Sequence, residues 1–392
     1  MKVLSGLDML MHAELAAVRG CAVGLVCNQA SVSHDLQHVT DVFAQAHRQG
    51  VLRLRALFGP QHGLWGHTQD NMIEWEGYVD PRLGVPVYSL YGRHRKPTAE
   101  MLNGIDKLVI DLQDVGARYY TFVWTVALCL EACAEQGIEV VILDRPNPIS
   151  GQAVEGCLLE PAYRSFVGLH PLPVRHGMTL GELGRYLQAN FYPRCSVTVI
   201  RMEGWQRAMY YDETGRHWVM PSPNMPSVET AIVYPGMCVL EATNLSEGRG
   251  TTRPFEMFGA PWLDGWQLAE RLNHAGLPGV WFRPLEFQPT FNKFAGEKCG
   301  GVFIHVLQRE HYEPFLSALF ILSEMFKMYP DQCQWKLPPY EYEYEKMPFD
   351  ILVGNGWLRQ EIETGASISR LKEKWQDELA EFLAVRQQFL LY

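Results

Sequence analysis

The stretch 107–143, KLVIDLQDVGARYYTFVWTVALCLEACAEQGIEVVIL, places a short apolar, β-branched run at each end of a long helical segment. The runs KLVID at 107–111 and EVVIL at 139–143 predict strands, and residues 120–136 between them predict a helix. A strand, a crossover helix and a second strand in this order form a parallel pair. The stretch therefore predicts an α/β fold built on a parallel sheet.

The same alternation continues on both sides of this unit. Apolar runs at 22–27, 54–58 and 196–201 predict further strands, and residues 40–49 and 179–190 predict helices. Thr179 and Glu182 match a capping box, in which each side chain bonds a free backbone N–H at the start of a helix. The alternation therefore predicts one parallel sheet with crossover helices in the first half of the chain.

The second half has a different pattern. Strand-like runs at 279–283 and 301–306 lie among predicted helices at 266–274, 314–328 and 366–390. A chain of 392 residues exceeds the roughly 250–300 residues at which single cores stop growing. The Pro-rich stretch 221–226 is the best linker candidate. We predict two domains, 1–226 and 227–392, the second a smaller α+β domain.

Composition excludes several classes of protein. A net charge of −10 argues against a nucleic-acid-binding protein, which needs a basic face. The nine cysteines have no C-x-x-C or zinc-ribbon spacing, which favours reduced thiols. No apolar run approaches the ~18 residues of a membrane span, and the N-terminus lacks a signal-peptide pattern. We expect a cytoplasmic protein, or a periplasmic or secreted one if the chain is already processed.

The loops that follow the predicted strands carry the candidate site, because ligands of parallel sheets bind beyond the carboxyl ends of the strands. No G-x-G-x-x-G or Walker A pattern occurs there, which disfavours a nicotinamide oxidoreductase. No metal-binding pattern such as H-E-x-x-H occurs either, so we expect neither cofactor nor metal. The candidates in these loops are Gln61, His62, Asp114, Arg118, Tyr120, Asn147, Glu155, Arg175 and His176.

A second polar run lies at 241–256 and contributes Asn244, Glu247 and Arg249, and Asn224 comes from the Pro-rich stretch. Asn, Glu and Arg side chains suit sugar hydroxyls, and Arg also suits a carboxylate. Each polar loop has a structural alternative as a turn, a helix cap or a solvated surface segment, and these alternatives remain open.

Eight motifs in order resemble the family of NamZ-type exo-β-N-acetylmuramidases, across nearly the whole chain. They are LFGPQHG at 57–63, PVYSLYG at 86–92, DLQDVG at 111–116, LDRPNP at 143–148, VEG at 154–156, RHGMT at 175–179, SPNMP at 222–226 and EATNLSEGRGTT at 241–252. The resemblance implies a Rossmann-like N-terminal domain and a C-terminal auxiliary domain. It also implies release of terminal N-acetylmuramic acid from peptidoglycan fragments, with the lactyl carboxylate held by Arg118, Arg175 or Arg249.

One position departs from the family pattern. Many relatives carry Glu in the Gly-Pro-Glu-His-Gly turn, where it is a proposed catalytic acid, and this chain has Gln61. Glycoside hydrolysis usually needs two carboxylic residues, one of them protonated. We predict Glu155 and Asp114 for these roles, with His62 as a helper. The alternatives are a catalytically silent muropeptide-binding protein and a hydrolase of a related amino sugar.

Overall fold

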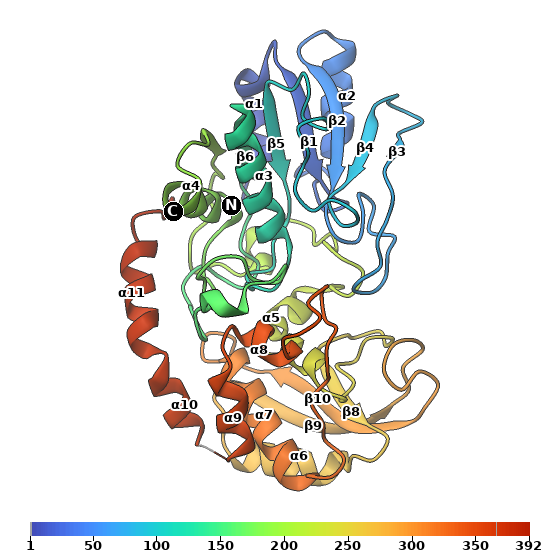
Figure 1. The fold of residues 1–392 in the computed structure, drawn as a ribbon, viewed down its shortest axis with the longest axis vertical. Coiled ribbons are helices and arrows are strands. Elements are labelled where there is room, and N and C mark those ends of the chain that lie inside the picture. The colour runs from blue at the N-terminus through green and yellow to red at the C-terminus, as the bar shows by residue number, and fades with distance from the viewer. Residues whose placement is uncertain (1, 366) are drawn as a thin grey trace.

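The computed structural model describes residues 2–365 and 367–392. Its first half is a seven-stranded sheet in the order β3-β4-β2-β1-β5-β6-β7, parallel except for β3, which pairs antiparallel with β4 (Figure 1). The strands are β1 (Ala22–Cys27), β2 (Arg53–Gly59), β3 (Tyr78–Val79), β4 (Pro86–Ser89), β5 (Lys107–Asp111), β6 (Glu139–Leu143) and β7 (Val197–Ile200). The predicted α/β fold with a parallel sheet is confirmed.

The strand order reverses at β1, which lies between β2 and β5. Leu25 of β1 is opposite Leu57 of β2 on one side and Val109 of β5 on the other. All three side chains are fully buried, as expected where helices cover both faces of a parallel sheet. Chains that leave such a reversal point diverge, so a crevice opens beyond the carboxyl ends of these strands.

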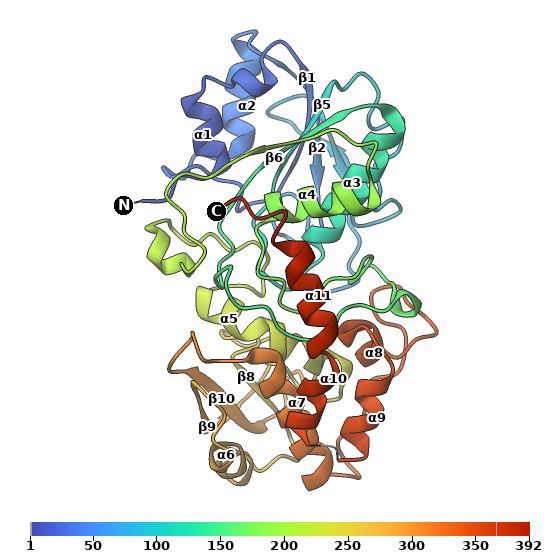
Figure 2. The same ribbon diagram turned by 90° about the vertical axis from the view of Figure 1, so that its left-hand side faces the viewer.

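Four helices cover this sheet. Figure 2 shows α1 and α2 on one face and α3 and α4 on the other. The helices are α1 (Gly6–His12), α2 (Val39–Arg48), α3 (Phe122–Gln136) and α4 (Leu180–Phe191). The capping box predicted at Thr179 is confirmed, because its side chain accepts from the Glu182 N–H and the Glu182 side chain accepts in return. Helix α3 begins two residues later than predicted and leaves Tyr120 in the turn before it.

The second half is an antiparallel sheet in the order β8-β10-β9 with helices packed around it. Helix α6 packs against β9 and β10, and α5 packs against α7. The elements are α5 (Val228–Met237), β8 (Met257–Ala260), α6 (Gly265–His274), β9 (Val280–Phe287), β10 (Cys299–Val306), α7 (Pro314–Met328), α8 (Pro348–Val353), α9 (Trp357–Glu363), α10 (Ile368–Lys374) and α11 (Gln376–Arg386). This half is the predicted α+β unit.

The last predicted helix, 366–390, is two helices, and its first residue lies outside the described residues. Helices α10 and α11 meet at Trp375, whose buried ring packs edge-on against Phe315 of α7. The chain changes direction at Trp375, where this ring enters the core. Periodicity alone could not reveal the break, since neither proline nor glycine marks it.

The end of the chain ties the two halves together. Helix α11 runs from the second half back along the first, and the C-terminus lies beside α4 (Figures 1 and 2). The Arg386 guanidinium donates to the carbonyls of Gly151 and Gly177. The Tyr392 hydroxyl donates to Oδ2 of the buried Asp144 at 2.9 Å and accepts from the backbone N–H of Met202 at 2.8 Å.

The hydrogen bonds of Tyr392 at the C-terminus give a stability prediction. Tyr392→Phe removes one hydrogen bond to Asp144 and leaves the Met202 N–H without its acceptor, which costs about 1–3 kcal/mol. The free energy of unfolding, measured by urea titration, should fall by that amount. Tyr344→Phe is the matched control, because Tyr344 is 67% exposed. Equal stability of both variants would show that the Tyr392 hydroxyl contributes nothing to the stability of the fold.

Candidate active site

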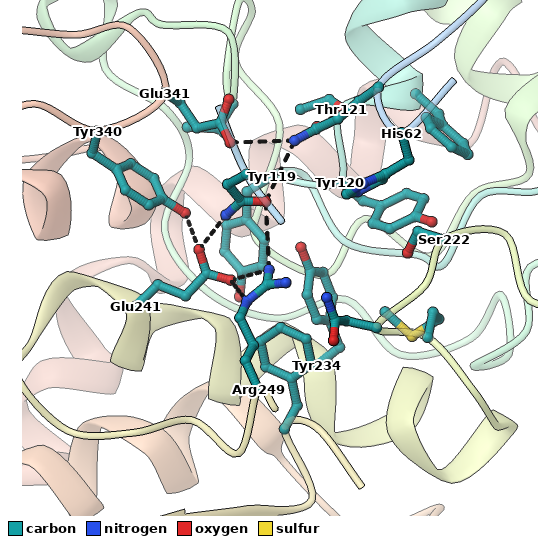
Figure 3. Close-up of a pocket in the computed structure, with 17 residues that line it drawn as sticks. His62, Tyr119, Tyr120, Thr121, Ser222, Tyr234, Glu241, Arg249, Tyr340 and Glu341 are labelled. Carbon is teal, nitrogen blue, oxygen red and sulfur yellow. Dashed lines mark hydrogen bonds and ion pairs between the residues drawn. The ribbon is translucent and has the colours of Figure 1, made fainter. Parts of the chain in front are cut away.

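One polar pocket lies where the two halves meet, beyond the carboxyl ends of β2 and β5. Residues from both halves face into it (Figure 3). The lining residues are Gln61, His62, Asn71, Tyr119, Tyr120, Thr121, Phe122, Val167, Ser222, Asn224, Met225, Tyr234, Glu241, Arg249, Phe255, Tyr340 and Glu341. The second half of the chain therefore covers the crevice that is expected where the strand order reverses.

The turn after β2 places the first two pocket residues. His62 adopts a φ of 71° and Gly63 a φ of 85°, a left-handed pair that reverses the chain sharply. His62 Nδ1 lies 2.8 Å from the Thr68 carbonyl and donates to it. Burial lowers the pKa of His62 to about 4, so the ring is neutral at physiological pH.

Gln61 is held from both ends of its amide. Its Oε1 accepts from the Thr121 hydroxyl at 2.6 Å, which fixes the orientation of the amide group. Its Nε2 then lies 3.1 Å from the hydroxyl of Tyr91, in the first half, and 3.3 Å from Oε1 of Glu341, in the second. The carbonyl end of Gln61 thus belongs to the α3 turn, and its amino end reaches Glu341.

Glu241 is a buried carboxylate with a strong cationic partner. Arg249 Nη2 donates to its Oε1 at 2.7 Å, while Tyr340 and Asn71 donate to its Oε2 at 2.6 and 2.8 Å. Burial alone would raise the pKa of Glu241. The Arg249 charge and these hydrogen bonds outweigh burial and hold the pKa below its usual value. Glu241 is therefore ionised at neutral pH.

Glu341 is in the opposite situation. It is 3% exposed, and the Tyr91 hydroxyl donates to its Oε2 at 2.8 Å. Burial, followed by the negative charge of Glu241, raises the pKa of Glu341 to about 7. Its backbone φ is 46° and that of Tyr342 is 64°, conformations that are uncommon for residues other than glycine and that concentrate at functional sites.

Aromatic rings form the rest of the wall. Tyr234 packs edge-on against Tyr119, Tyr120 and Phe255, with ring centres 5.7, 5.8 and 4.9 Å apart. The Arg249 guanidinium lies 5.0 Å from the centre of the Phe255 ring. The pocket therefore combines apolar faces with two carboxyl groups whose pKa values are driven apart, the arrangement that separates an acid from a base in hydrolases.

Five of the predicted site residues line this pocket: Gln61, His62, Tyr120, Asn224 and Arg249. The Pro-rich stretch that was the linker candidate is part of the wall, because Asn224 Nδ2 donates to the Gln69 carbonyl at 2.8 Å and fixes the stretch to the loop after β2.

The other predicted residues lie outside the lining and make structural contacts. Arg118 is fully buried and donates to the carbonyls of Cys157, Leu172 and Leu352 at 2.6–2.8 Å. Its three acceptors come from distant parts of the chain, so Arg118 joins segments of both halves. Arg118 is not among the residues that line the pocket.

Glu155 and Asp114, predicted as the catalytic pair, also face elsewhere. Glu155 Oε1 accepts from the Leu316 N–H at the start of α7 at 2.8 Å, and burial raises its pKa to about 7. Asp114 Oδ2 accepts from the Gly116 N–H at 2.7 Å and lies 3.3 Å from His176 Nε2. Their catalytic roles remain predictions that the pocket geometry does not support.

The five remaining candidates also make structural contacts, among them His176, whose Nδ1 accepts from the Met178 N–H at 3.2 Å. Asn147 donates to the Met178 carbonyl, and Arg175 donates to the Ile149 carbonyl. Asn244 bonds Gln332 and Gln334 in the second half. Glu247 forms ion pairs with Arg249 and Lys293, at 3.4 and 2.9 Å between the charged atoms. It therefore helps to hold the Arg249 side chain in place.

Sequence reasoning missed Glu241 and Glu341 as site residues. Glu241 opens the polar run from which Asn244, Glu247 and Arg249 were chosen. Glu341 lies in the run YEYEYE at 340–345, which has the composition of a solvated loop. The one signal in this run was the density of tyrosine, a residue that combines apolar area with a hydrogen-bonding group.

Two family models match the chain. The model described as the N-terminal part of exo-β-N-acetylmuramidase NamZ matches residues 23–229, and the one for its C-terminal part matches 232–392. A peptidoglycan β-N-acetylmuramidase NamZ of Bacillus subtilis (strain 168) is 42% identical over 392 residues, which is all of this chain and 92% of that protein.

Two solved structures share the fold over the full length. Both are DUF1343 family proteins of Bacteroides fragilis NCTC 9343. One has a TM-score of 0.88 at 33% identity and the other a TM-score of 0.77 at 27% identity. Each comparison covers 100% of this chain and 99% of the other. The arrangement of the two halves is therefore shared with these proteins.

The burial of Arg118 gives a second stability prediction. Arg118→Met keeps the apolar stem but leaves three buried carbonyls without a donor, and we expect a loss of about 3 kcal/mol or more in the free energy of unfolding. Arg93→Met, at an exposed arginine, is the control. A fully stable Arg118→Met protein would return this residue to the candidates for ligand contact.

Proposed function

The chain belongs to the NamZ family of exo-β-N-acetylmuramidases, and from this we propose that it is a glycosidase that releases terminal β-linked N-acetylmuramic acid from peptidoglycan fragments. The observation that carries the proposal is the pair of buried glutamates, Glu241 and Glu341, on one pocket. Glycoside hydrolysis needs one carboxyl group that is protonated and one that is ionised, and burial and charge push this pair in those directions.

Arg249 is suited to the group that distinguishes this sugar. N-acetylmuramic acid carries a lactyl carboxylate that N-acetylglucosamine lacks, and of the three arginines predicted for it, Arg249 lines the pocket. Its Nη1 makes no hydrogen bond within the described part of the chain, and Asp70 Oδ1 lies 3.8 Å away. A carboxylate on the ligand would supply the missing acceptor.

The pocket is nearly closed in this structure. Its cavity volume of about 30 Å³ has room for one or two water molecules. A sugar ring therefore enters only when the walls part. Most of the lining residues, Tyr340 and Glu341 among them, lie in segments outside the helices and strands. Enclosure of the sugar would then exclude bulk water from the bond that is broken.

A second candidate function has one observation in its favour. Gln61 occupies the position at which the resemblance places a catalytic glutamate, and an amide neither donates nor accepts a proton as an acid or base. A pocket that binds a muropeptide without cleaving it would fit this substitution. A hydrolase of a related amino sugar is the other alternative.

Hydrolysis of chromogenic glycosides separates these possibilities. We expect the purified protein to release 4-nitrophenol from the β-N-acetylmuramide and not from the β-N-acetylglucosaminide, because the second lacks the carboxylate for Arg249. Binding of N-acetylmuramic acid by calorimetry without turnover would favour the silent binding protein. Turnover of the glucosaminide alone would favour the related hydrolase.

We also propose a cytoplasmic location, where the enzyme would act on imported wall fragments. All nine cysteines are free and eight are buried, as suits a reducing compartment. Within residues 2–365 and 367–392, no helix is long and apolar enough to cross a bilayer.

Cell fractionation checks the location. The protein should accompany a cytoplasmic marker enzyme in immunoblots of fractionated cells. Its recovery with periplasmic or secreted proteins would overturn the cytoplasmic proposal and leave the glycosidase activity untouched.

A further inference from the structure

The residue that protonates the leaving group is the open question in this pocket. Cleavage of an unactivated glycosidic bond needs a proton on the departing oxygen. Gln61 cannot supply it, and His62 is neutral and already uses Nδ1–H on the Thr68 carbonyl. Among the described residues that line the pocket, the carboxylic acids are Glu241 and Glu341.

The contacts of Glu241 exclude it as the acid. Its two oxygens accept four hydrogen bonds, two from the Arg249 guanidinium and one each from the Tyr340 hydroxyl and Asn71 Nδ2. A protonated carboxyl would lose its ion pair with Arg249, whose guanidinium is equally buried. Glu241 therefore stays an anion and shapes the electrostatics of the pocket.

Glu341 has the surroundings of a neutral acid. It is buried as deeply as Glu241, but its two direct partners are the uncharged Tyr91 hydroxyl and Gln61 amide. The nearest cation, Arg95, stacks on the Tyr342 ring at 4.0 Å from its centre and makes no ion pair with Glu341 among the described contacts. The hydrogen bonds from Tyr91 and Gln61 stabilise a carboxylate there only partly, and no described salt bridge gives Glu341 a cationic partner like the one that Arg249 gives Glu241.

We propose that Glu341 is the general acid of this enzyme and that Gln61 is a positioning residue for it; the assignment rests on the glycosidase function proposed above. Thr121 fixes the amide of Gln61, so that Nε2 points at Glu341 Oε1. Tyr91 donates to Oε2, at the shorter distance of 2.8 Å against 3.3 Å. Because the contact at Oε1 is the longer and weaker of the two, we assign the proton to Oε1.

The step balances without a cofactor. Glu341 gives its proton to the glycosidic oxygen as the bond from that oxygen to C1 of the muramic acid breaks, and the shortened fragment leaves as an alcohol. Water supplies a hydroxyl to C1, and the remaining proton of that water restores the acid form of Glu341. The ionised Glu241 stabilises the positive charge that develops on the sugar ring.

The pH dependence follows from the groups that face Glu341. These are Tyr91 and Arg95 after β4, Gln61 after β2, Glu241 in the second half and Tyr342 on its own loop. Burial and the Glu241 charge hold the pKa of Glu341 at about 7. Only the protonated form donates, so activity falls as pH rises through about 7. Glu241 has a lowered pKa and stays ionised through this range.

The test compares two leaving groups. Glu341→Gln should lower kcat about 10²- to 10⁴-fold on the natural disaccharide of N-acetylmuramic acid and N-acetylglucosamine. On the 4-nitrophenyl muramide the fall should be at least ten times smaller, because 4-nitrophenolate leaves without a proton. The loss of activity above pH 7 should disappear in this variant. Glu345→Gln, at an exposed glutamate of the same loop, should match the wild type on both substrates.

Each outcome decides the assignment. Equal losses on both glycosides with an unchanged pH profile would make Glu341 a structural residue and overturn it. Full activity of Glu341→Gln on the disaccharide would also overturn it, while the glycosidase function stands. A wild type that cleaves neither glycoside overturns the proposed function itself. If thermal unfolding shows that the variant does not fold, the pH dependence of wild-type activity decides. Above pH 7 that activity must fall steeply on the disaccharide and only slightly on the nitrophenyl glycoside.

Discussion

The buried ion pair between Glu241 and Arg249 is the constraint on which the pocket depends. Removing two charges from water is costly unless each finds its partner and further hydrogen bonds. Here the remaining bonds come from separate regions of the chain, with Asn71 in the first half and Tyr340 in the second. The two halves must therefore close on this pair for its desolvation to be offset, which ties the site to the packing of the domains.

Local patterns in the sequence predicted the first half of the fold well. Five of its seven strands are short apolar runs, and Thr179 and Glu182 mark the start of α4, so each of these signals lies within a few residues of the feature that it specifies. The short strands β3 and β4 were not predicted. Gln61, His62 and Tyr120 were found for the same reason, because they lie in loops that follow predicted strands, at the edge of the sheet where ligands bind.

The part of the site that was not predicted comes from residues far apart in the sequence. Glu341 reaches Gln61 across 280 residues, from an irregular segment with no periodic signal. Burial decides the other cases. Arg118 and Glu155 are polar residues in loops, as a ligand site requires, but they bond the backbone carbonyls and N–H groups of neighbouring segments. Sequence alone cannot tell a side chain that holds a loop from one that the loop displays.

Closure links the chemistry to the fold. The pKa of Glu341 is raised first by burial and then by the charge of Glu241, and both causes need the pocket walls in contact. With the walls apart, water would solvate the Glu341 carboxylate and return its pKa toward the usual value, leaving it ionised at neutral pH. On this argument Glu341 would take up the proton needed for bond cleavage as the pocket closes. The empty pocket has room for only one or two water molecules. Glu341 would therefore become an acid when the pocket encloses the substrate.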